Sequence, residues 1–506
     1  MTQFGQHILD PLRLTFESCA DRNAFYINNQ PHTYRTLRER IRAIRAELRR
    51  RGIHHTLVAV ALDDHIDTYA SILALWMEGN AYLPLNPHWP LQRNLDIISQ
   101  TSVDHLLYTP SGAELSQQFN TPATNAILTT QLPQAPTPDT PPLDTPDTDL
   151  AYILFTSGST GKPKGVCLTR DNLAAFIDSF WHTGITIDSS DRCLQAFDLT
   201  FDVSIQSFLT ALIKGACVYT IPFGQVKYLY AAALITEQGI TCAAMAPSML
   251  SYLRPYFDEL DASSLRTTIL TAEACPSHLA EEWYGCAKNT AIFDLYGPTE
   301  ATIYSTCYPV PRSGSIPSSN GVLPIGEPLK NVRALIIDSH STPLPPDNEG
   351  ELCLAGRQVT PGYWQNPTQD AKAFITLNGS DRYYRTGDLC TQLPDGTIIY
   401  HGRIDQQAKI QGYRVELGEI EHHAASFLQH TCRTVAVTYQ TPKGLDQIAL
   451  FVENTHNNND DALIQYLNTK MPQYMIPAKI IHLQSLPLNA NQKIDRNALK
   501  AIINNQ

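Results

Sequence analysis

Residues 156–164 read TSGSTGKPK and follow the apolar stretch 151–155. Hydroxyls, glycine amides and lysine ammonium groups suit a chain of phosphates, because N–H groups and positive charge can face the anion. The spacing is not that of a Walker A loop: only two residues separate the glycines of GSTG, and proline follows the first lysine. The stretch therefore predicts a strand that ends in a triphosphate-binding loop, with a plain surface loop as the alternative.

Four later motifs carry further aromatic, hydroxyl, carboxylate and lysine side chains. They are LYGPTEAT at 295–302, YRTGDL at 384–389, GRIDQQAKIQGYRVELGEIE at 402–421 and NANQKIDR at 489–496. Taken singly, each could be a turn, a helix cap or solvated charge. Taken together and in this order, they are very specific for a single protein family.

This order of motifs resembles the adenylate-forming superfamily of acyl-CoA synthetases, luciferases and adenylation domains of nonribosomal peptide synthetases. The resemblance covers almost the whole chain and is best to the amino-acid-activating branch, which includes free-standing D-alanine–carrier-protein ligases. It implies two half-reactions. A carboxylate attacks the α-phosphate of ATP and releases pyrophosphate, and a phosphopantetheine thiol then displaces AMP to form a thioester.

The resemblance also implies a role for each matching residue. Lys493 is the expected catalytic bridge between the substrate carboxylate and the α-phosphate, for which a compact flexible cation is suited. Glu300 is expected to hold Mg²⁺. The expected ATP-site residues are Thr156, Ser157, Gly158, Ser159, Thr160 and Gly161 around the β- and γ-phosphates, Lys162 and Lys164 nearby, Tyr296 stacked on the adenine, Gly297 beside it in the sequence, Thr299 at the α-phosphate, Asp388 at the ribose, and Arg403 at the ribose or a phosphate.

In this superfamily a small C-terminal domain swings between the half-reactions. Asp405 matches the hinge, and Lys409, Gly412 and Tyr413 match the face that turns inward for thioester formation. A glycine there leaves space for a pantetheine arm. The family commonly has a basic residue before this glycine, whereas this chain has Gln411.

Asp202 is the key residue for the choice of acid. In amino-acid-activating relatives an aspartate at this place pairs with the substrate α-ammonium, and such a pair selects strongly for the counter-charge. The alternative is a helix N-cap. By the same resemblance the side-chain pocket is lined by Val203, Gln206, Ala244, Ile269, Thr271, Leu295, Ile303 and Tyr304.

This pocket is mostly apolar, and its only charges are Asp202 and Lys493. A charged substrate side chain would therefore stay unpaired, and the bulk of Leu295 and Tyr304 favours a small one. We predict ATP-dependent activation of a small neutral amino acid; proline, alanine and glycine, and either enantiomer, stay open. The acceptor is predicted to be the phosphopantetheine of a separate carrier protein, because the chain ends soon after the motif of Lys493.

Two other classes of protein compete with this prediction. An acyl-CoA synthetase for a non-amino carboxylic acid would use the same ATP chemistry but would not need Asp202. A binding protein without catalysis would lack Lys493, Glu300 or Asp388, and all three are present.

Composition limits the partners. The chain has 506 residues, a length that predicts two or more domains. Its net charge of −12 argues against a surface that coats nucleic acid. It has no uncharged apolar run near 18 residues and no basic N-terminus followed by an apolar stretch. We therefore expect no membrane span and no secretory signal, and a cytoplasmic location.

Hydrophobic patterns place the motifs on elements. Between about residues 56 and 300 strands and helices alternate, which predicts mostly parallel sheets flanked by helices. Short strands follow between 320 and 400. The expected architecture is a large α/β domain with a β-rich subdomain, residues 1–403, and a small mobile α+β domain, residues 404–506. Residues 121–149, rich in Pro and Thr, predict an irregular connection.

One basic stretch, residues 34–52, predicts an amphipathic helix. Leu37, Ile41, Ile44 and Leu48 recur at helical spacing, and arginines fill the opposite face. We expect that basic face to be solvated, with RNA binding as the weaker alternative.

Overall fold

The computed structural model describes residues 2–119, 125–134, 140–158, 162–314, 316–377, 379, 381–405, 407–429, 432–442, 444–453, 459–488 and 494–504. The chain divides into two compact units. The first comprises Met1–Pro87, Thr101–Leu154 and Gly165–Ile404, and the second His88–Gln100, Phe155–Lys164 and Asp405–Gln506. The predicted boundary at 403/404 thus lies next to the boundary between Ile404 and Asp405. The structure differs in grouping 88–100 and 155–164 with the C-terminal residues, to which they are hydrogen-bonded.

The first unit contains a seven-stranded sheet in the order β18-β8-β7-β4-β3-β5-β6. Its pairs β3–β4, β3–β5, β4–β7 and β5–β6 are parallel, as the alternating pattern predicts. The strands are β3 (Leu57–Ala61), β4 (Ala81–Leu85), β5 (Leu106–Tyr108), β6 (Ala126–Leu128), β7 (Leu150–Thr156), β8 (Lys164–Thr169) and β18 (Gly362–Tyr363). The strand β6 corrects the expectation that 121–149 is irregular throughout, because Ala126–Leu128 pairs with β5.

A nine-stranded sheet runs in the order β15-β14-β13-β12-β11-β9-β10-β1-β2. The neighbouring strands from β13 to β1 in this order are parallel, so their carboxyl ends share one edge. The strands are β1 (Asn23–Ile27), β2 (Gln30–Thr33), β9 (Arg192–Gln195), β10 (Cys217–Thr220), β11 (Cys242–Met245), β12 (Thr267–Thr271), β13 (Ala291–Tyr296), β14 (Thr306–Val310) and β15 (Glu327–Pro328).

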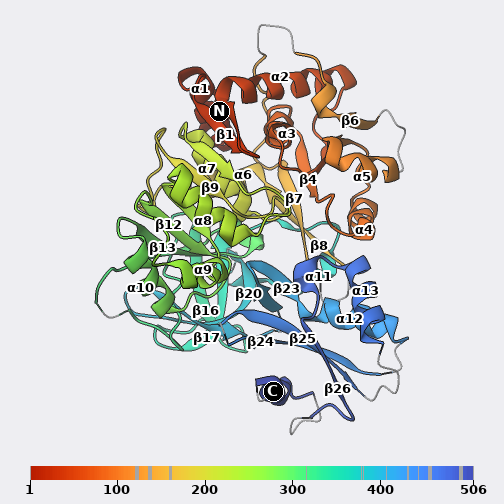
Figure 1. The fold of residues 1–506 in the computed structure, drawn as a ribbon, viewed down its shortest axis with the longest axis vertical. Helices are drawn as coiled ribbons and strands as arrows, with labels where there is room; N and C mark the ends of the chain where they lie inside the picture. The colour runs from red at the N-terminus through yellow and green to blue at the C-terminus, as the bar shows by residue number, and fades with distance from the viewer. Residues whose placement is uncertain are drawn as a thin grey trace. The chain divides into compact units, whose positions relative to one another are not determined.

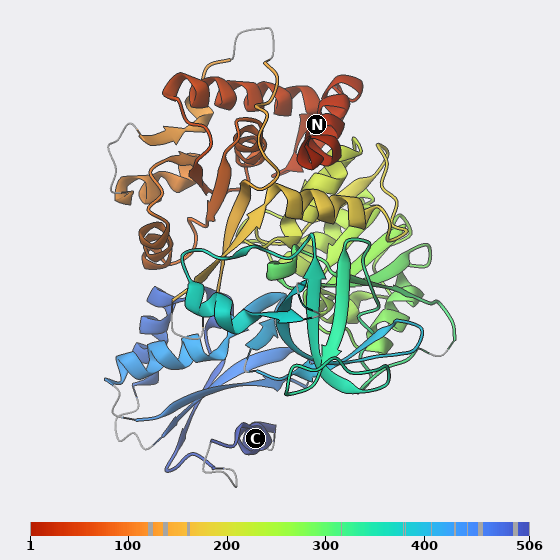
Figure 2. The ribbon, with the colours of Figure 1, turned by 180° about the vertical axis from the view of Figure 1, so that it is seen from behind.

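An antiparallel five-stranded sheet completes the first unit, and its residues, coloured green to light blue, can be followed in Figure 2. The strands are β16 (Val332–Ile337), β17 (Glu349–Gly356), β19 (Phe374–Leu377), β20 (Asp381–Gln392) and β21 (Ile398–Arg403). The helices of this unit are η1 (Gly5–Leu9), α1 (Asp10–Ser18), α2 (Tyr34–Arg51), α3 (Ile66–Met77), η2 (Pro110–Gly112), α5 (Ala113–Gln118), η4 (Thr129–Gln131), α6 (Arg170–Phe180), α7 (Val203–Ile213), α8 (Lys227–Gln238), α9 (Pro247–Leu253), η5 (Arg254–Tyr256), α10 (Ser277–Cys286), η6 (Thr299–Ala301) and α11 (Pro367–Ala373).

The second unit is α+β, as predicted for the C-terminal residues. A core of aliphatic side chains, including Ile420, Leu450 and Leu467, joins its helices to its sheet. Its elements are α4 (Leu91–Thr101), β22 (Gln407–Ile410), β23 (Tyr413–Glu416), α12 (Leu417–Phe427), β24 (Thr434–Gln440), β25 (Asp446–Glu453), α13 (Asp460–Lys470), η7 (Gln473–Met475), β26 (Lys479–Leu483) and α14 (Arg496–Asn504).

The basic helix α2 corrects one prediction. Its apolar face is buried as expected, and α2 lies beside α3 (Figure 1). The basic face is not simply solvated: Arg45 and Arg49 both donate to the buried carboxylate of Glu78, and Arg40 pairs with the buried Asp67. These guanidinium groups neutralise carboxylates inside the unit, which argues against the RNA-binding alternative.

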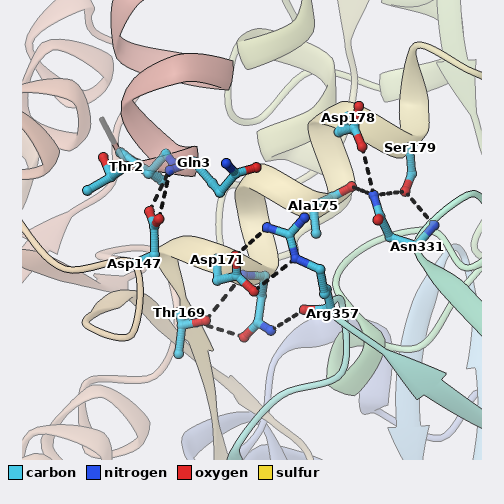
Figure 3. Close-up of polar contacts among 12 residues, drawn as sticks. Thr2, Gln3, Asp147, Thr169, Asp171, Ala175, Asp178, Ser179, Asn331 and Arg357 are labelled. Atoms are coloured by element: carbon cyan, nitrogen blue, oxygen red, sulfur yellow. Dashed lines mark hydrogen bonds and ion pairs between the residues drawn. The ribbon is translucent and has the colours of Figure 1, made fainter.

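A polar network anchors α6 to the segment that follows β17 (Figure 3). Thr169 and Asn172 form a capping box at the start of α6, and the Asn172 amide also donates to the carbonyl of Arg357, at 2.7 Å. The Arg357 guanidinium pairs with Asp171. Asn331 donates to the carbonyl of Ala175. The network therefore fixes the backbone at Arg357, immediately before residues that support the candidate site.

Candidate functional site

Asp202 immediately precedes α7, and its side chain is buried. It makes no N-cap hydrogen bond, which counts against the capping alternative. The nearby Thr299 side chain and the N–H groups of Val203 and Ile303 favour the ionised carboxylate, yet Oδ2 has no hydrogen-bond partner among the described residues. Burial raises the pKa of Asp202 to about 6, and the nearby Glu300 carboxylate acts in the same direction. A buried carboxylate oxygen with no partner can accept a cationic donor from a ligand.

The backbone beside Asp202 is strained. Thr302 and Ile303 have φ values of 58° and 69°, in a region that β-branched residues avoid. Such strain costs about 1–3 kcal/mol per residue and is typical of functional sites. Here the strained turn places the Ile303 N–H near enough to Asp202 to favour its ionised form.

Sequence reasoning missed the residue that holds this strained turn. The buried Gln358 amide donates to the Tyr304 carbonyl at 2.7 Å, and Thr302 Oγ1 donates to the Gln358 carbonyl at 2.5 Å. The only available signal was the polar RQVTPGYW stretch after a predicted strand.

The predicted pocket residues come together in the first unit. Ala244 of β11 pairs with Ile269 of β12, and Thr271 of β12 pairs with Leu295 of β13. Tyr304 donates to Gln206 Oε1 at 3.2 Å. All eight predicted pocket residues are buried: Val203, Gln206, Ala244, Ile269, Thr271, Leu295, Ile303 and Tyr304.

Tyr304 is fixed from several sides. Its hydroxyl hydrogen-bonds to Gln206, and its ring lies edge-on to Phe176, with centroids 5.9 Å apart. The amide of Gln206 in turn donates to Thr210 at 3.3 Å. A large side chain held by several partners limits the space in the pocket.

The predicted ribose-binding residues also meet. Arg403 Nη1 donates to Asp388 Oδ1 at 2.8 Å across the β20–β21 pair, and the Tyr296 hydroxyl donates to Asp388 Oδ2. All three lie in the first unit, and Asp388 is buried. Burial and the neighbouring Asp388 charge raise the pKa of Tyr296, so Tyr296 stays a hydrogen-bond donor.

Glu300 is fully buried, and its Oε1 accepts a hydrogen bond from Tyr363, at 2.7 Å. The Thr360 N–H donates to the Glu300 carbonyl. No group of three or more potential ligands gathers in the described residues, so a metal cage of protein side chains is not formed there. One carboxylate still fits Mg²⁺, which proteins usually bind through one or two carboxylates together with substrate phosphates. Tyr363 is a second supporting residue that sequence reasoning missed.

Residues of the predicted phosphate loop belong to the second unit. A methyl group on Gly158 would lie 2.1 Å from the Lys162 carbonyl oxygen, so the tight loop requires glycine there. Thr156 Oγ1 is buried without a partner among the described residues, and Lys162 is exposed. Ser157 and Gly158 hydrogen-bond to residues 414–419. Ser159, Thr160 and Gly161 lie outside the described residues.

The predicted inward face of the C-terminal part is a β-hairpin. Lys409 of β22 pairs with Arg414 of β23, and the turn contains Gln411 and Gly412, both with positive φ. Tyr413 stacks on Tyr474, with ring centroids 3.9 Å apart.

The predicted catalytic lysine, Lys493, lies outside the described residues. The described site residues thus form two groups, each within one unit. Asp202, Thr299 and Glu300, the eight pocket residues, and Tyr296, Gly297, Asp388 and Arg403 lie in the first. Thr156, Ser157, Gly158, Lys162, Lys164 and Lys409 lie in the second.

The profile of the family described as AMP-binding enzyme matches residues 13–364. The chain belongs to this family. Zwittermicin A synthase ZmaJ of Bacillus cereus is 32% identical to this AMP-binding enzyme and is matched over 92% of its length and 95% of the chain. Tyrocidine synthase 2 of Brevibacillus parabrevis is 31% identical over 96% of the chain, but the chain spans only 13% of that protein.

Solved structures share the fold of this AMP-binding enzyme. The Vibrio cholerae adenylation domain AlmE, solved with glycyl-adenosine-5'-phosphate, has a TM-score of 0.85 at 24% identity, with 98% of both chains covered. NpsA-ThdA from Klebsiella oxytoca, an artificially fused adenylation–PCP di-domain, has a TM-score of 0.80 at 26% identity, with 94% of this chain and 93% of that chain covered. The AMP-binding enzyme is therefore an adenylate-forming protein of the nonribosomal peptide synthetase adenylation branch, and the predicted fold class is confirmed. Within the described ranges, none of its helices is both long and apolar enough to cross a membrane.

Proposed function

We propose that the AMP-binding enzyme activates a small neutral amino acid as its aminoacyl-adenylate and transfers it to the phosphopantetheine thiol of a separate carrier protein. The observation that carries this proposal is the buried Asp202 carboxylate, whose Oδ2 has no partner among the described residues. A substrate α-ammonium would satisfy it, and a fatty or aryl acid would leave it unpaired. This observation favours an amino acid over the substrates of an acyl-CoA synthetase.

In the first half-reaction a carboxylate oxygen of the amino acid bonds to the α-phosphorus, and the bond to pyrophosphate breaks. Two anions must approach, so positive charge and alignment govern the rate. Asp202 holds the ammonium end, Thr299 the α-phosphate and Asp388 the ribose, and Lys493 bridges the two reacting anions. Mg²⁺ held by Glu300 would offset charge on the phosphates.

In the second half-reaction the pantetheine sulfur bonds to the acyl carbon, and AMP leaves. The fused adenylation–PCP arrangement of NpsA-ThdA supports a carrier protein as the acceptor. A cytoplasmic location, where ATP is available, belongs to the same proposal. Supplying the adenylated enzyme with coenzyme A or with a pantetheinylated carrier separates the two acceptor classes. Faster transfer to coenzyme A would favour the acyl-CoA synthetase alternative.

The function is tested by ATP–pyrophosphate exchange over the amino acids and their D-forms, with fatty and aryl acids as comparators. We expect the fastest exchange with a small neutral amino acid; alanine, glycine and proline are the first to test. Fastest exchange with an acid that has no amino group would overturn the proposed role of Asp202.

Tyr304 is expected to set the size limit of the substrate. Tyr304→Ala removes a ring held by Gln206 and Phe176, so larger side chains should fit. We expect the ratio of kcat/KM for leucine over that for the native substrate to rise by about 10- to 200-fold, the range that added pocket volume supports. Pyrophosphate exchange measures both rates. Tyr304→Phe is the matched control, because it keeps the ring and should keep the native preference; an unchanged preference in Tyr304→Ala would contradict the prediction.

A further inference from the structure

Two of the described anion-binding groups of residues 156–164 are already bonded to carboxylates. The Gly158 N–H donates to Glu419 Oε2 at 3.2 Å, and Lys164 Nζ lies 3.6 Å from Glu416 Oε1. These two groups, an amide N–H and an ammonium, are the kinds of group that hold a phosphate oxygen. Here carboxylate oxygens take that place.

The single donor of the Ser157 hydroxyl is also used. It donates its proton to the Arg414 carbonyl at 3.1 Å and accepts from the Glu416 N–H at 3.0 Å. A hydroxyl has only one proton to donate, so a phosphate oxygen could be bound only after the bond to Arg414 breaks. Three predicted phosphate ligands are therefore occupied by the short segment 414–419.

The two carboxylates are held in place by other residues. Glu419 is fully buried and accepts from Arg93 at 2.7 Å, and the Arg93 side chain is only 4% exposed. Glu416 accepts from the Gln407 amide at 2.5 Å. The partners of both carboxylates offset the cost of burying them. We call this arrangement, in which segment 414–419 occupies Ser157, Gly158 and Lys164, the docked state.

We propose that segment 414–419 competes with the triphosphate, and with pyrophosphate: the carboxylates of Glu416 and Glu419 compete for Lys164 and Gly158, and the Arg414 carbonyl for Ser157. The proposal rests on the proposed function, in which this segment holds the β- and γ-phosphates. Phosphate oxygens and the two carboxylates cannot share the same donors, and their like charges repel. Departure of pyrophosphate frees the donors, and the carboxylates then occupy them.

The competition is reciprocal. Pyrophosphate binding makes the docked state less stable, and the docked state lowers the affinity for pyrophosphate by the same factor. Weakening the carboxylates should therefore tighten pyrophosphate binding. It should also slow the step that needs the docked state, which we assign to thioester formation.

The test uses the full chain with Glu419→Gln and, because Glu419 is buried with Arg93, a second variant, Glu416→Gln. Titration calorimetry with inorganic pyrophosphate and Mg²⁺ gives the affinity. AMP release from a supplied aminoacyl-adenylate and pantetheine gives the second half-reaction. In both variants we expect pyrophosphate to bind at least about 5-fold more tightly, and AMP release to be slower.

Glu421→Gln is the matched control on the same helix. Glu421 accepts from Arg496 and from the Ala436 N–H, away from residues 156–164, so this variant should bind pyrophosphate like the wild type. Variants that bind pyrophosphate with unchanged or weaker affinity would overturn the competition, since a purely structural role would weaken binding. Wild-type protein that binds neither pyrophosphate nor ATP would instead overturn the proposed function, and this inference with it.

Discussion

Asp202→Asn should lower kcat/KM for the amino acid by about 10²- to 10³-fold, because it removes one partner of a buried charge pair. Among the described residues, the neighbouring carboxylate is that of Glu300, whose Oε1 already accepts a hydrogen bond from Tyr363. Pyrophosphate exchange at varied amino acid concentration measures the loss, which should appear mainly in KM.

Asp198→Asn is the matched control for this variant. Asp198 lies in the same FDLTFD stretch but is already satisfied by Asn86 and by the Thr200 N–H and hydroxyl. It should lose little activity. Equal losses in the two variants would show that Asp202 supports the fold without binding the ammonium.

Because the pKa of Asp202 is raised, the KM for the amino acid should depend on pH. Burial raises this pKa to about 6, so the carboxylate is ionised at pH 7 and becomes protonated as the pH falls through 6. KM for the amino acid should therefore rise below pH 6 in the wild type and stay level in Asp202→Asn. A profile with the same inflection in both proteins would assign the titration to another group.

Stability should change in the opposite direction to activity. The folded pKa of Asp202 exceeds the ordinary value of 3.8, so the folded state holds its proton more tightly than the unfolded state. Stability is then lost as the pH rises from about 4 to 6, and near pH 7 the ionised buried carboxylate costs up to ~3 kcal/mol. In the absence of substrate, Asp202→Asn should melt at a higher temperature than the wild type at pH 7, with the difference vanishing near pH 4.

A second carboxyl group, that of Asp64, also contributes to the pH dependence of wild-type stability. It does not contribute to the stability difference between the wild type and Asp202→Asn. Burial also raises the pKa of Asp64 to about 6, so the wild-type stability curve contains both carboxyl groups. Subtracting the Asp202→Asn curve removes Asp64, which both proteins share. The remaining pH dependence belongs to Asp202.

The sequence predicted the parallel strands because strands and helices alternate along residues 56–300. The pocket residues were assigned through the family resemblance, and Ala244, Ile269 and Leu295 lie on the neighbouring strands β11, β12 and β13. Sequence could not predict the occupied hydrogen bonds around these residues. Gln358 and Tyr363 act through contacts 54 and 63 residues away along the chain, which no local pattern encodes.

The basic helix α2 shows the same limit in another form. The helical spacing of its hydrophobic residues predicted which face is buried. Charge alone did not distinguish solvated arginines from arginines paired with buried carboxylates. Glu78 lies 33 residues from Arg45 and carries no sign in the sequence of its burial. Pairing of this kind depends on tertiary packing.

Gly297→Ala should reduce pyrophosphate exchange to about 1% of the wild-type rate or less, because a displacement of about 1 Å in a site can cost 10²-fold. A methyl group at Gly297 would lie 2.4 Å from the Ile303 carbonyl oxygen and 2.7 Å from Tyr304 Cα. Both neighbours are backbone atoms, so no side-chain rotation relieves the clash. The turn at 302–304 must move, and its movement carries the Ile303 N–H away from Asp202 and Tyr304 away from Gln206.

The control for Gly297→Ala is Gly285→Ala. Gly285 lies in α10, and a methyl group there would meet nothing within 4 Å. Alanine favours a helix over glycine by about 1 kcal/mol, so this variant should melt slightly higher and keep its activity. If Gly297→Ala melts lower but exchanges pyrophosphate at the wild-type rate, the turn at 302–304 contributes to folding only. If it loses exchange while keeping most of its stability, the strained turn is the part of the backbone that sets the position of Asp202's partners, and its strain is maintained for binding.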